Sequence, residues 1–214
     1  KQSNSQSAAN SVEVKTSKLG IGFEKLDRAV FDPNKAYDKV AQLGVKWIRL
    51  QSGWARTEKE KGIYDFAWLD DIVDNLIVRG LKPWMCLAYG NGIYTAEANE
   101  IFGAVGCPPI ETERERCAWD RYVFALTQRY IGRVEHFEVW NEPNWFWSHI
   151  AHEHQPNGTE YGEFVIRTSK AVKRANPNAK VIGGVESVGD IAFINKAFQT
   201  GMGDYIDYFS YHIY

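Results

Sequence analysis

The sequence lacks the features that define several protein classes. No uninterrupted apolar run in its 214 residues approaches the ~20 that a membrane-spanning helix requires, so we expect no membrane span. The formal net charge of −2 is too small to favour nucleic acid or an anionic membrane as a partner. Three cysteines are too few for a disulfide framework. Cys107 and Cys117 could still bridge a loop to the following helix, while Cys86 lies in an apolar stretch typical of a core.

Aromatic residues, in contrast, are in excess. The chain has 8 Trp and 11 Tyr, more than a core requires, and stacking on sugar rings is one common use for such a surplus. The first residues, KQSNSQSAANS, are polar and of low complexity, so we expect residues 1–18 to form a flexible or disordered tail. The tail is equally compatible with a mature N-terminus left after signal removal and with a disordered leader. On the first interpretation the protein is secreted or periplasmic.

Past residue 18, short apolar runs alternate with segments of helical periodicity. The predicted strands cover residues 19–23, 45–50, 81–90, 134–140, 180–185 and 205–214. The predicted helices between them cover residues 32–44, 69–77, 119–130, 161–172 and 191–198. Strict alternation predicts right-handed βαβ units and a parallel sheet. No Gly-x-Gly-x-x-Gly turn follows the first strand, which argues against a dinucleotide-binding sheet and favours an α/β fold of the (β/α)8 TIM-barrel type.

The stretch EVWNEPNWFW (138–147) carries the most chemical information. Asn141 and Glu142 stand where the fourth predicted strand ends, which in a TIM barrel is the rim of the active site. The surrounding rings are those of Trp140, Trp145, Phe146 and Trp147. A carboxyl group walled by rings is partly desolvated, which raises its pKa and keeps it protonated for donation to a glycosidic oxygen. Outside this context, the same residues would simply form a turn and pack.

Four segments together resemble a known family: WIRLQSGW (47–54), KPWMCLAYG (82–90), HFEVWNEPNW (136–145) and IDYFSYHIY (206–214). The element FEVWNEPN is similar to the strand-four signature of clan A glycoside hydrolases, and the fuller pattern is most similar to glycoside hydrolase family thirty-nine. The resemblance runs from about residue 19 to residue 214. It implies a retaining (β/α)8-barrel glycosidase that acts on a β-linked oligo- or polysaccharide.

The resemblance also implies roles for particular residues. Glu142 would be the general acid/base, and Asn141 would bind the 2-hydroxyl of the sugar. Arg49 would lie beneath the site and orient the nucleophilic carboxylate, although an ion pair with Glu138 is an alternative that can coexist with this role. His212 would line the subsite of cleavage, or else serve as a satisfied core histidine.

Further substrate contacts are predicted from the aromatic residues and from strand geometry. Trp54, Trp145 and Trp147 are predicted to be sugar-stacking platforms. Tyr214 shares a strand face with His212 by the period-two rule and is predicted to contact the substrate as well.

The number of predicted βα units leaves the identity of the second carboxyl group, the nucleophile, open. Retention needs two carboxyl groups, and in this clan the second is a glutamate at the end of strand seven, whereas this sequence supplies about six βα units. We therefore expect residues 19–214 to be a C-terminally incomplete catalytic domain of a longer enzyme that needs no cofactor. Glu186, after the fifth strand, is predicted to be a solvated loop carboxylate.

Two other interpretations compete with this one. The first is a catalytically inactive glycan-binding barrel, which would keep an aromatic cleft without a functional pair of carboxyl groups. The second is a metal-dependent hydrolase that uses His149, His152 and His154; it is disfavoured because these residues fit no zinc-hydrolase motif. The identity of the sugar, exo or endo action and the oligomeric state are left open.

Overall fold

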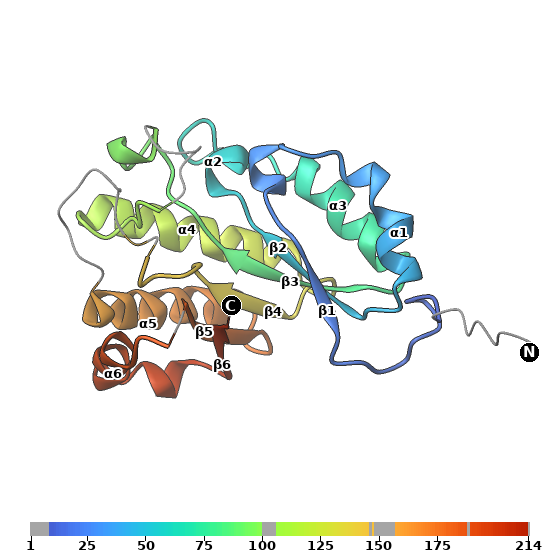
Figure 1. Ribbon diagram of the computed structural model, residues 1–214. Helices are drawn as coiled ribbons and strands as arrows, with labels where there is room; N and C mark the ends of the chain where they lie inside the picture. The colour runs from blue at the N-terminus through green and yellow to red at the C-terminus, as the bar shows by residue number, and fades with distance from the viewer. Residues whose placement is uncertain (1–8, 100–105, 146, 148–156, 188, 214) are drawn as a thin grey trace, which may run out of the picture.

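The structure, a computed structural model, describes residues 9–99, 106–145, 147, 157–187 and 189–213. Within these residues, six strands form one parallel sheet in which each strand pairs with the next along the chain (Figure 1). The strands are β1 (Gly20–Phe23), β2 (Trp47–Gln51), β3 (Lys82–Leu87), β4 (His136–Val139), β5 (Lys180–Ser187) and β6 (Tyr208–His212). The predicted parallel α/β arrangement is therefore confirmed.

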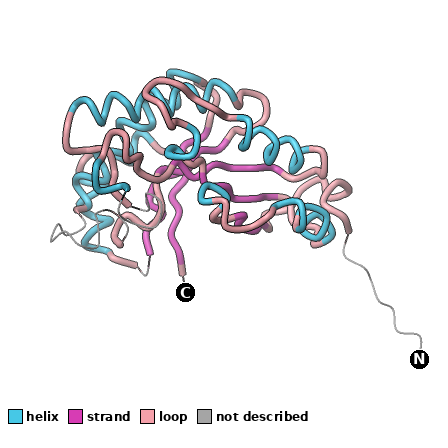
Figure 2. Tube along the Cα trace, turned by 90° about the horizontal axis from the view of Figure 1, so that it is seen from above, coloured by secondary structure: helices cyan, strands magenta, loops and turns pink. Residues whose placement is uncertain are grey.

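Helices connect the strands and lie on the outer side of the curled sheet (Figure 2). The α-helices are α1 (Tyr37–Gln42), α2 (Trp54–Thr57), α3 (Ala67–Ile77), α4 (Glu113–Arg129), α5 (Gly158–Ala175) and α6 (Ile191–Gln199). The 3-10 turns are η1 (Leu26–Arg28), η2 (Pro33–Lys35), η3 (Ala96–Asn99) and η4 (Met202–Tyr205). The sequence analysis did not predict α2, and it placed the start of the last strand at Tyr205, which lies in η4.

Side-chain alternation gives the sheet two different faces. On β2, Ile48 and Leu50 are fully buried against the helical layer, while Arg49 and Gln51 point to the opposite, inner side. The buried outer-face core comes from strands and helices alike: Ile48, Leu50, Met85, Leu87, Phe137, Val139, Val181, Leu69, Val73, Leu76, Trp119, Tyr122, Val123, Leu126, Tyr161, Phe164 and Val165. The inner face is where the polar side chains of consecutive strands meet, because their register aligns Gln51 with Cys86 and Cys86 with Glu138.

A bulge in β5 sharpens the curl of the sheet. The pairing of β5 with β6 shifts register between Gly184 and Glu186. Gly184 has φ +94°, and a Cβ there would lie 2.4 Å from the carbonyl oxygen of Ser210, so no larger residue fits without moving the strand. Glu186 was predicted to lie in a loop; its backbone belongs to β5 and pairs with Tyr211.

The N-terminal residues are partly packed, which corrects one prediction. Residues 1–8 lie outside the described residues, but Ser11 is fully buried within the segment predicted to be a flexible tail. Its hydroxyl donates to the carbonyl oxygen of Ala41 at 3.0 Å, and its backbone oxygen accepts from Lys46 Nζ at 3.2 Å. The segment therefore covers the end of the sheet opposite the strand ends that carry Asn141 and Glu142.

The cysteines form no bridge of the kind left open above. Cys117 has a free thiol that donates to Glu113 Oε1 at 3.1 Å, so the possible bond to Cys107 is absent. Cys86 is fully buried, as predicted for a core residue.

Candidate active site

The turn after β4 has an unusual backbone that aims Glu142 across the inner face of the sheet. Trp140 has φ +70° and Glu142 has φ +46°, a left-handed conformation that costs free energy for residues other than glycine. The turn is closed by a hydrogen bond from Trp145 N to Glu142 O at 2.8 Å. Asn144 also fixes it, since its side chain both donates to Ser187 O and accepts from Ser187 N at the end of β5. Such strain is typical of functional turns held by their surroundings.

Glu142 meets His212 across the end of the sheet. His212 Nδ1 lies 2.8 Å from Glu142 Oε1, although β4 and β6 are separated by β5. Both side chains keep contact with solvent, with exposed fractions of 12% for Glu142 and 22% for His212. The structure thus brings together the predicted acid/base and the predicted subsite histidine in a reachable position.

Arg49 lies next to this pair and binds three acceptors. Its Nε donates to Glu138 Oε2 at 2.5 Å, its Nη1 to Glu24 Oε1 at 2.7 Å and its Nη2 to Asn141 Oδ1 at 3.0 Å. The ion pair with Glu138 that the sequence left as an alternative role is present. Because arginine only donates, it fixes the amide of Asn141 with Oδ1 toward Arg49 and the NH2 group directed away from it.

The charges around Arg49 keep it ionised despite burial. Burial by itself would lower the pKa of the guanidinium, but Cys86, Glu138 and Glu24 around it more than reverse this and hold the pKa above its ordinary value. Glu138 is nearly inaccessible, with 3% of its side chain exposed, so it serves Arg49 and not a bound molecule.

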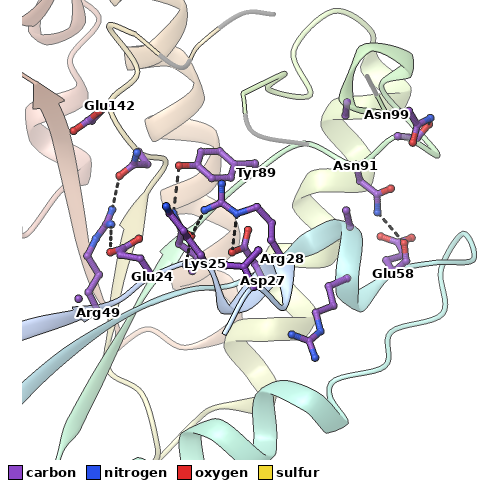
Figure 3. Close-up of a pocket in the computed structure, with 18 of the residues that line it drawn as sticks. Glu24, Lys25, Asp27, Arg28, Arg49, Glu58, Tyr89, Asn91, Asn99 and Glu142 are labelled. Atoms are coloured by element: carbon purple, nitrogen blue, oxygen red, sulfur yellow. Dashed lines mark hydrogen bonds and ion pairs between the residues drawn. The ribbon is translucent and has the colours of Figure 1, made fainter. Parts of the chain in front are cut away.

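A cleft of about 1420 Å³ opens above these residues (Figure 3). It extends from Glu142 and His212 past Arg49 and Glu24 to Arg28, Tyr89 and Asn91. Together these residues lie on, or shortly after, strands β1, β2, β3, β4 and β6, towards their carboxyl ends. This volume exceeds the 300–1,000 Å³ common for small-ligand pockets, and the lining is rich in hydrogen-bonding side chains. The cleft therefore lies where a parallel barrel carries its chemistry.

Two of the predicted sugar platforms are wrong. Trp54 and Trp147 are both fully buried. Trp54, on α2, lies with its ring between those of Tyr94 and Tyr122, and its Nε1 donates to Glu58. The short helix α2 turns the ring into the layer beneath the cleft, where no sugar can reach it.

Trp147 is packed below the turn that carries Glu142 in the same way. Its ring contacts Trp140, Tyr161 and Phe164, and its Nε1 lies 3.2 Å from Glu160 Oε2. Trp140 is likewise fully buried, so these rings support the turn from below and do not wall Glu142 as predicted.

The remaining predictions of substrate contact stay open. Trp145 is 62% exposed but is not among the described residues that line the cleft, so its role as a platform stays a prediction. Tyr214 lies outside the described residues.

Several cleft residues were missed by the sequence analysis. Glu24, Arg28, Gln51 and Tyr89 all line the cleft, and each follows or ends one of the first three strands. The rule that barrel chemistry collects at carboxyl ends of strands applies to Glu24 and Gln51 directly, and it could have found them. Arg28 has no such signal because it lies five residues beyond β1.

The structure offers no support for the metal-dependent interpretation. Within the described residues, no group of three or more His, Cys, Asp or Glu side chains could hold a metal ion. His149, His152 and His154 lie outside the described residues. In the part of the chain that is described, no helix is both long and apolar enough to cross a membrane.

A parallel half-barrel with its polar side chains gathered towards the carboxyl ends of the strands defines an α/β fold of the TIM-barrel class. The model of the family described as "Glycosyl hydrolases family 39" matches residues 31–214. This chain belongs to that family.

Curated relatives and solved structures agree with the assignment. The chain is 27% identical over 195 residues to a beta-xylosidase of Caldicellulosiruptor saccharolyticus, with 81% of this chain and 37% of that protein covered. It is 28% identical over 134 residues to a beta-xylosidase of Geobacillus stearothermophilus, with 58% and 25% covered. A monomeric beta-xylosidase from Caulobacter crescentus superposes with a TM-score of 0.67 at 23% identity, covering 92% of this chain and 41% of that one. The chain thus spans less than two fifths of the length of these curated relatives.

Proposed function

We propose that the protein to which this chain belongs is a retaining β-glycosidase with Glu142 as general acid/base. The observation that carries the proposal is the Glu142–His212 contact at the mouth of the cleft, with Asn141 and Arg49 beside it. In the first step, Glu142 protonates the glycosidic oxygen as the aglycone leaves and a second carboxylate bonds to the anomeric carbon. In the second, Glu142 removes a proton from water, whose oxygen bonds to the anomeric carbon and displaces that carboxylate, releasing the sugar.

His212 can hydrogen-bond to Glu142 in both the protonated and the ionised form of its carboxyl group. A protonated Glu142 can donate its O–H to His212 Nδ1, and an ionised Glu142 can accept an N–H from the same nitrogen. The contact therefore holds the carboxyl group in place while its proton is lost and regained. Asn141, with its NH2 group directed away from Arg49, is proposed to donate to the 2-hydroxyl of the sugar.

The nucleophile is proposed to be a glutamate beyond residue 214, at the end of a seventh strand. Retention needs a carboxylate ~5–5.5 Å from Glu142. Glu138 is buried against Arg49, and Glu24 is held by the same guanidinium. Trapping the full-length protein with 2,4-dinitrophenyl 2-deoxy-2-fluoro-β-D-xyloside should label one glutamate C-terminal to residue 214, identified by peptide mass spectrometry. A label on Glu24 would overturn this placement.

The substrate is proposed to be a β-xyloside. Two relatives with the larger coverage are named beta-xylosidase, and matches named beta-galactosidase cover a smaller part of this chain. A β-galactoside is therefore the second candidate. We also propose secretion and a role in polysaccharide breakdown, for which an open cleft would give a polymer access.

The direct test replaces Glu142 by Gln in the full-length protein. Hydrolysis of xylobiose should fall by about 10²–10⁴-fold, the usual share of general acid–base catalysis. Hydrolysis of 2,4-dinitrophenyl β-D-xyloside should lose less in its first step, because that leaving group needs no proton. Glu135→Gln, at the exposed opposite end of β4, is the matched control and should keep full activity. Unchanged xylobiose hydrolysis in Glu142→Gln would remove Glu142 from the mechanism.

Binding without hydrolysis is the competing function. A catalytically inactive barrel would bind xylo-oligosaccharides, yet the wild-type protein would cleave neither xylobiose nor the dinitrophenyl glycosides of xylose and galactose.

A further inference from the structure

Arg28 also lines the cleft, and neighbouring side chains hold its guanidinium without occupying all of its donor nitrogens. Arg28, on η1, lies with its Nε 3.4 Å from Asp27 Oδ1 and donates from Nη2 to Gln51 Oε1 at 3.0 Å. Its guanidinium also lies 5.8 Å from the centre of the Tyr89 ring. Figure 3 shows this group beside the Arg49–Glu24 pair, further along the cleft from Glu142.

One edge of the Arg28 guanidinium is available to a ligand. Among the described residues, Nη1 has no hydrogen-bond acceptor, and 20% of the side chain is exposed on the cleft. Arginine is a donor of fixed planar geometry, so a guanidinium held on one edge presents its other edge in one direction. A ligand oxygen can bind there without the entropy cost of ordering a free side chain.

The groups that hold Arg28 are themselves rigid. Gln51 is 2% exposed; its Oε1 also accepts from Lys25 N at 3.1 Å, and its Nε2 donates to Tyr89 OH at 3.3 Å. The Asp27 side chain is 5% exposed, and its Oδ1 makes no hydrogen bond among the described residues. The backbone of Asp27 and Arg28 and the Arg28 guanidinium hold this carboxylate, and its Oδ1 is left without a hydrogen bond in the described part of the chain at some cost in stability.

The backbone of this turn repeats the feature seen at Glu142. Lys25 has φ +66° and Ala29 has φ +53°, so left-handed residues flank η1 on both sides. Trp140 and Glu142 flank Asn141 in the same conformation. Strain of this kind persists where surrounding structure forces it, and it collects at ligand-binding turns.

We propose that Arg28 is the centre of a second sugar-binding subsite, adjacent to the sugar bound at Glu142, in which Nη1 donates to an oxygen of the neighbouring sugar unit. This inference rests on the proposed glycosidase function and specifies its substrate as a chain of two or more sugar units. The Tyr89 ring and Gln51 fix the guanidinium, and Asp27 is a positioning residue for it.

The test compares binding of sugars of different length in the full-length protein that carries Glu142→Gln. Arg28→Met should weaken binding of xylobiose and xylotriose about tenfold or more and change binding of xylose less than twofold. Calorimetry measures the oligosaccharides, and ligand-observed NMR measures xylose. Arg28→Lys keeps the charge but loses the planar fork, so it should give an intermediate loss and serves as a second variant should the Met variant fold poorly.

Arg114→Met is the matched control, since Arg114 lies on α4, is exposed, is not among the residues that line the cleft and should leave all three affinities unchanged. An equal loss for xylose and xylobiose would place Arg28 in the subsite of Glu142 and overturn the proposal. Unchanged binding of xylobiose in both Arg28 variants would overturn it as well.

Failure of the proposed acid/base role of Glu142 can be distinguished from failure of the Arg28 subsite. If Glu142→Gln still hydrolyses xylobiose, binding is measured instead with the non-hydrolysable S-linked analogue thioxylobiose. The acid/base assignment is then wrong, while a length-dependent loss in Arg28→Met still supports the subsite. If the wild-type protein binds neither xylo-oligosaccharides nor β-1,4-galactobiose, both proposals fail together.

Discussion

Arg49, on β2, and Arg28, on the turn that follows β1, line the same cleft but differ in how their donors are used. Arg49 is surrounded by two carboxylates and an amide oxygen, and each of its donor nitrogens has an acceptor. Arg28 lines the cleft with one carboxylate at 3.4 Å and one amide oxygen, and its Nη1 has no acceptor among the described residues. Saturation of the donors, more than residue type or location, separates an arginine that holds the site together from one that can bind a ligand.

The largest expected difference between the two is in stability. Arg49→Met leaves Glu138 buried without a counter-charge, so the free energy of unfolding should fall by about 3–5 kcal/mol. Arg28→Met should lower it by less, because Arg28 Nε lies 3.4 Å from Asp27 Oδ1 without a hydrogen bond between them, whereas Arg49 Nε donates to Glu138. Urea denaturation of the two variants of the full-length protein measures both. Equal losses would mean that Arg28 is structural and would break the comparison.

The next largest expected effect is on kcat, through the contact between His212 and Glu142 beside Arg49. His212→Phe removes the hydrogen bond to Glu142, and we expect kcat for xylobiose to fall by about 10–100-fold, since a misplaced acid/base loses part of its contribution. The pH dependence of kcat should change with it. His212→Asn, which can still hydrogen-bond, should recover part of the activity. Rates in His212→Phe that match the wild-type protein at every pH would leave His212 as a packing residue.

The smallest expected change is in the free energy of unfolding of Asp27→Asn, and its size should depend on pH. Burial is the main cause that raises the pKa of Asp27 above 3.8, although Arg28 opposes it. A carboxyl group with a raised pKa in the folded state binds its proton more tightly there than in the unfolded state. The free energy of unfolding therefore falls as pH rises through that window.

Asp27→Asn should accordingly be more stable than the wild-type protein at pH 7, by about 1 kcal/mol or less, and the difference should vanish near pH 3. Melting temperatures at the two pH values test this. The same variant should bind xylobiose less tightly, because Arg28 loses its ionic partner. A variant that is less stable at pH 7 would show that the Asp27–Arg28 pair stabilises the fold.

The architecture and the catalytic turn were predictable because they depend on local patterns. Short strand-like segments rich in apolar residues, such as 45–50, alternate with segments of helical periodicity, and this alternation predicts parallel βαβ units. The position of Asn141 and Glu142 at the end of a strand followed from the same pattern.

The orientation of the tryptophans was not predictable in this way. The number of tryptophans in a sequence shows that aromatic surface is plentiful, but it does not show whether a given ring points into the core or into the cleft. Trp54 lies on a four-residue helix too short to have a periodicity, and it turned out to be core. Arg28 was missed for a related reason, since its position depends on two left-handed residues, Lys25 and Ala29, that no sequence rule would assign.

The bulge at Gly184 has an effect well beyond β5. Glu142 and His212 come from strands that are not neighbours, so the distance between their side chains depends on how tightly the sheet bends over the strand between them. The residue at this bulge has no side chain, and the atoms nearest to a Cβ built there belong to Ser210 and Phe209. A larger residue at position 184 would therefore displace β6 relative to β5 and alter the distance between Glu142 and His212.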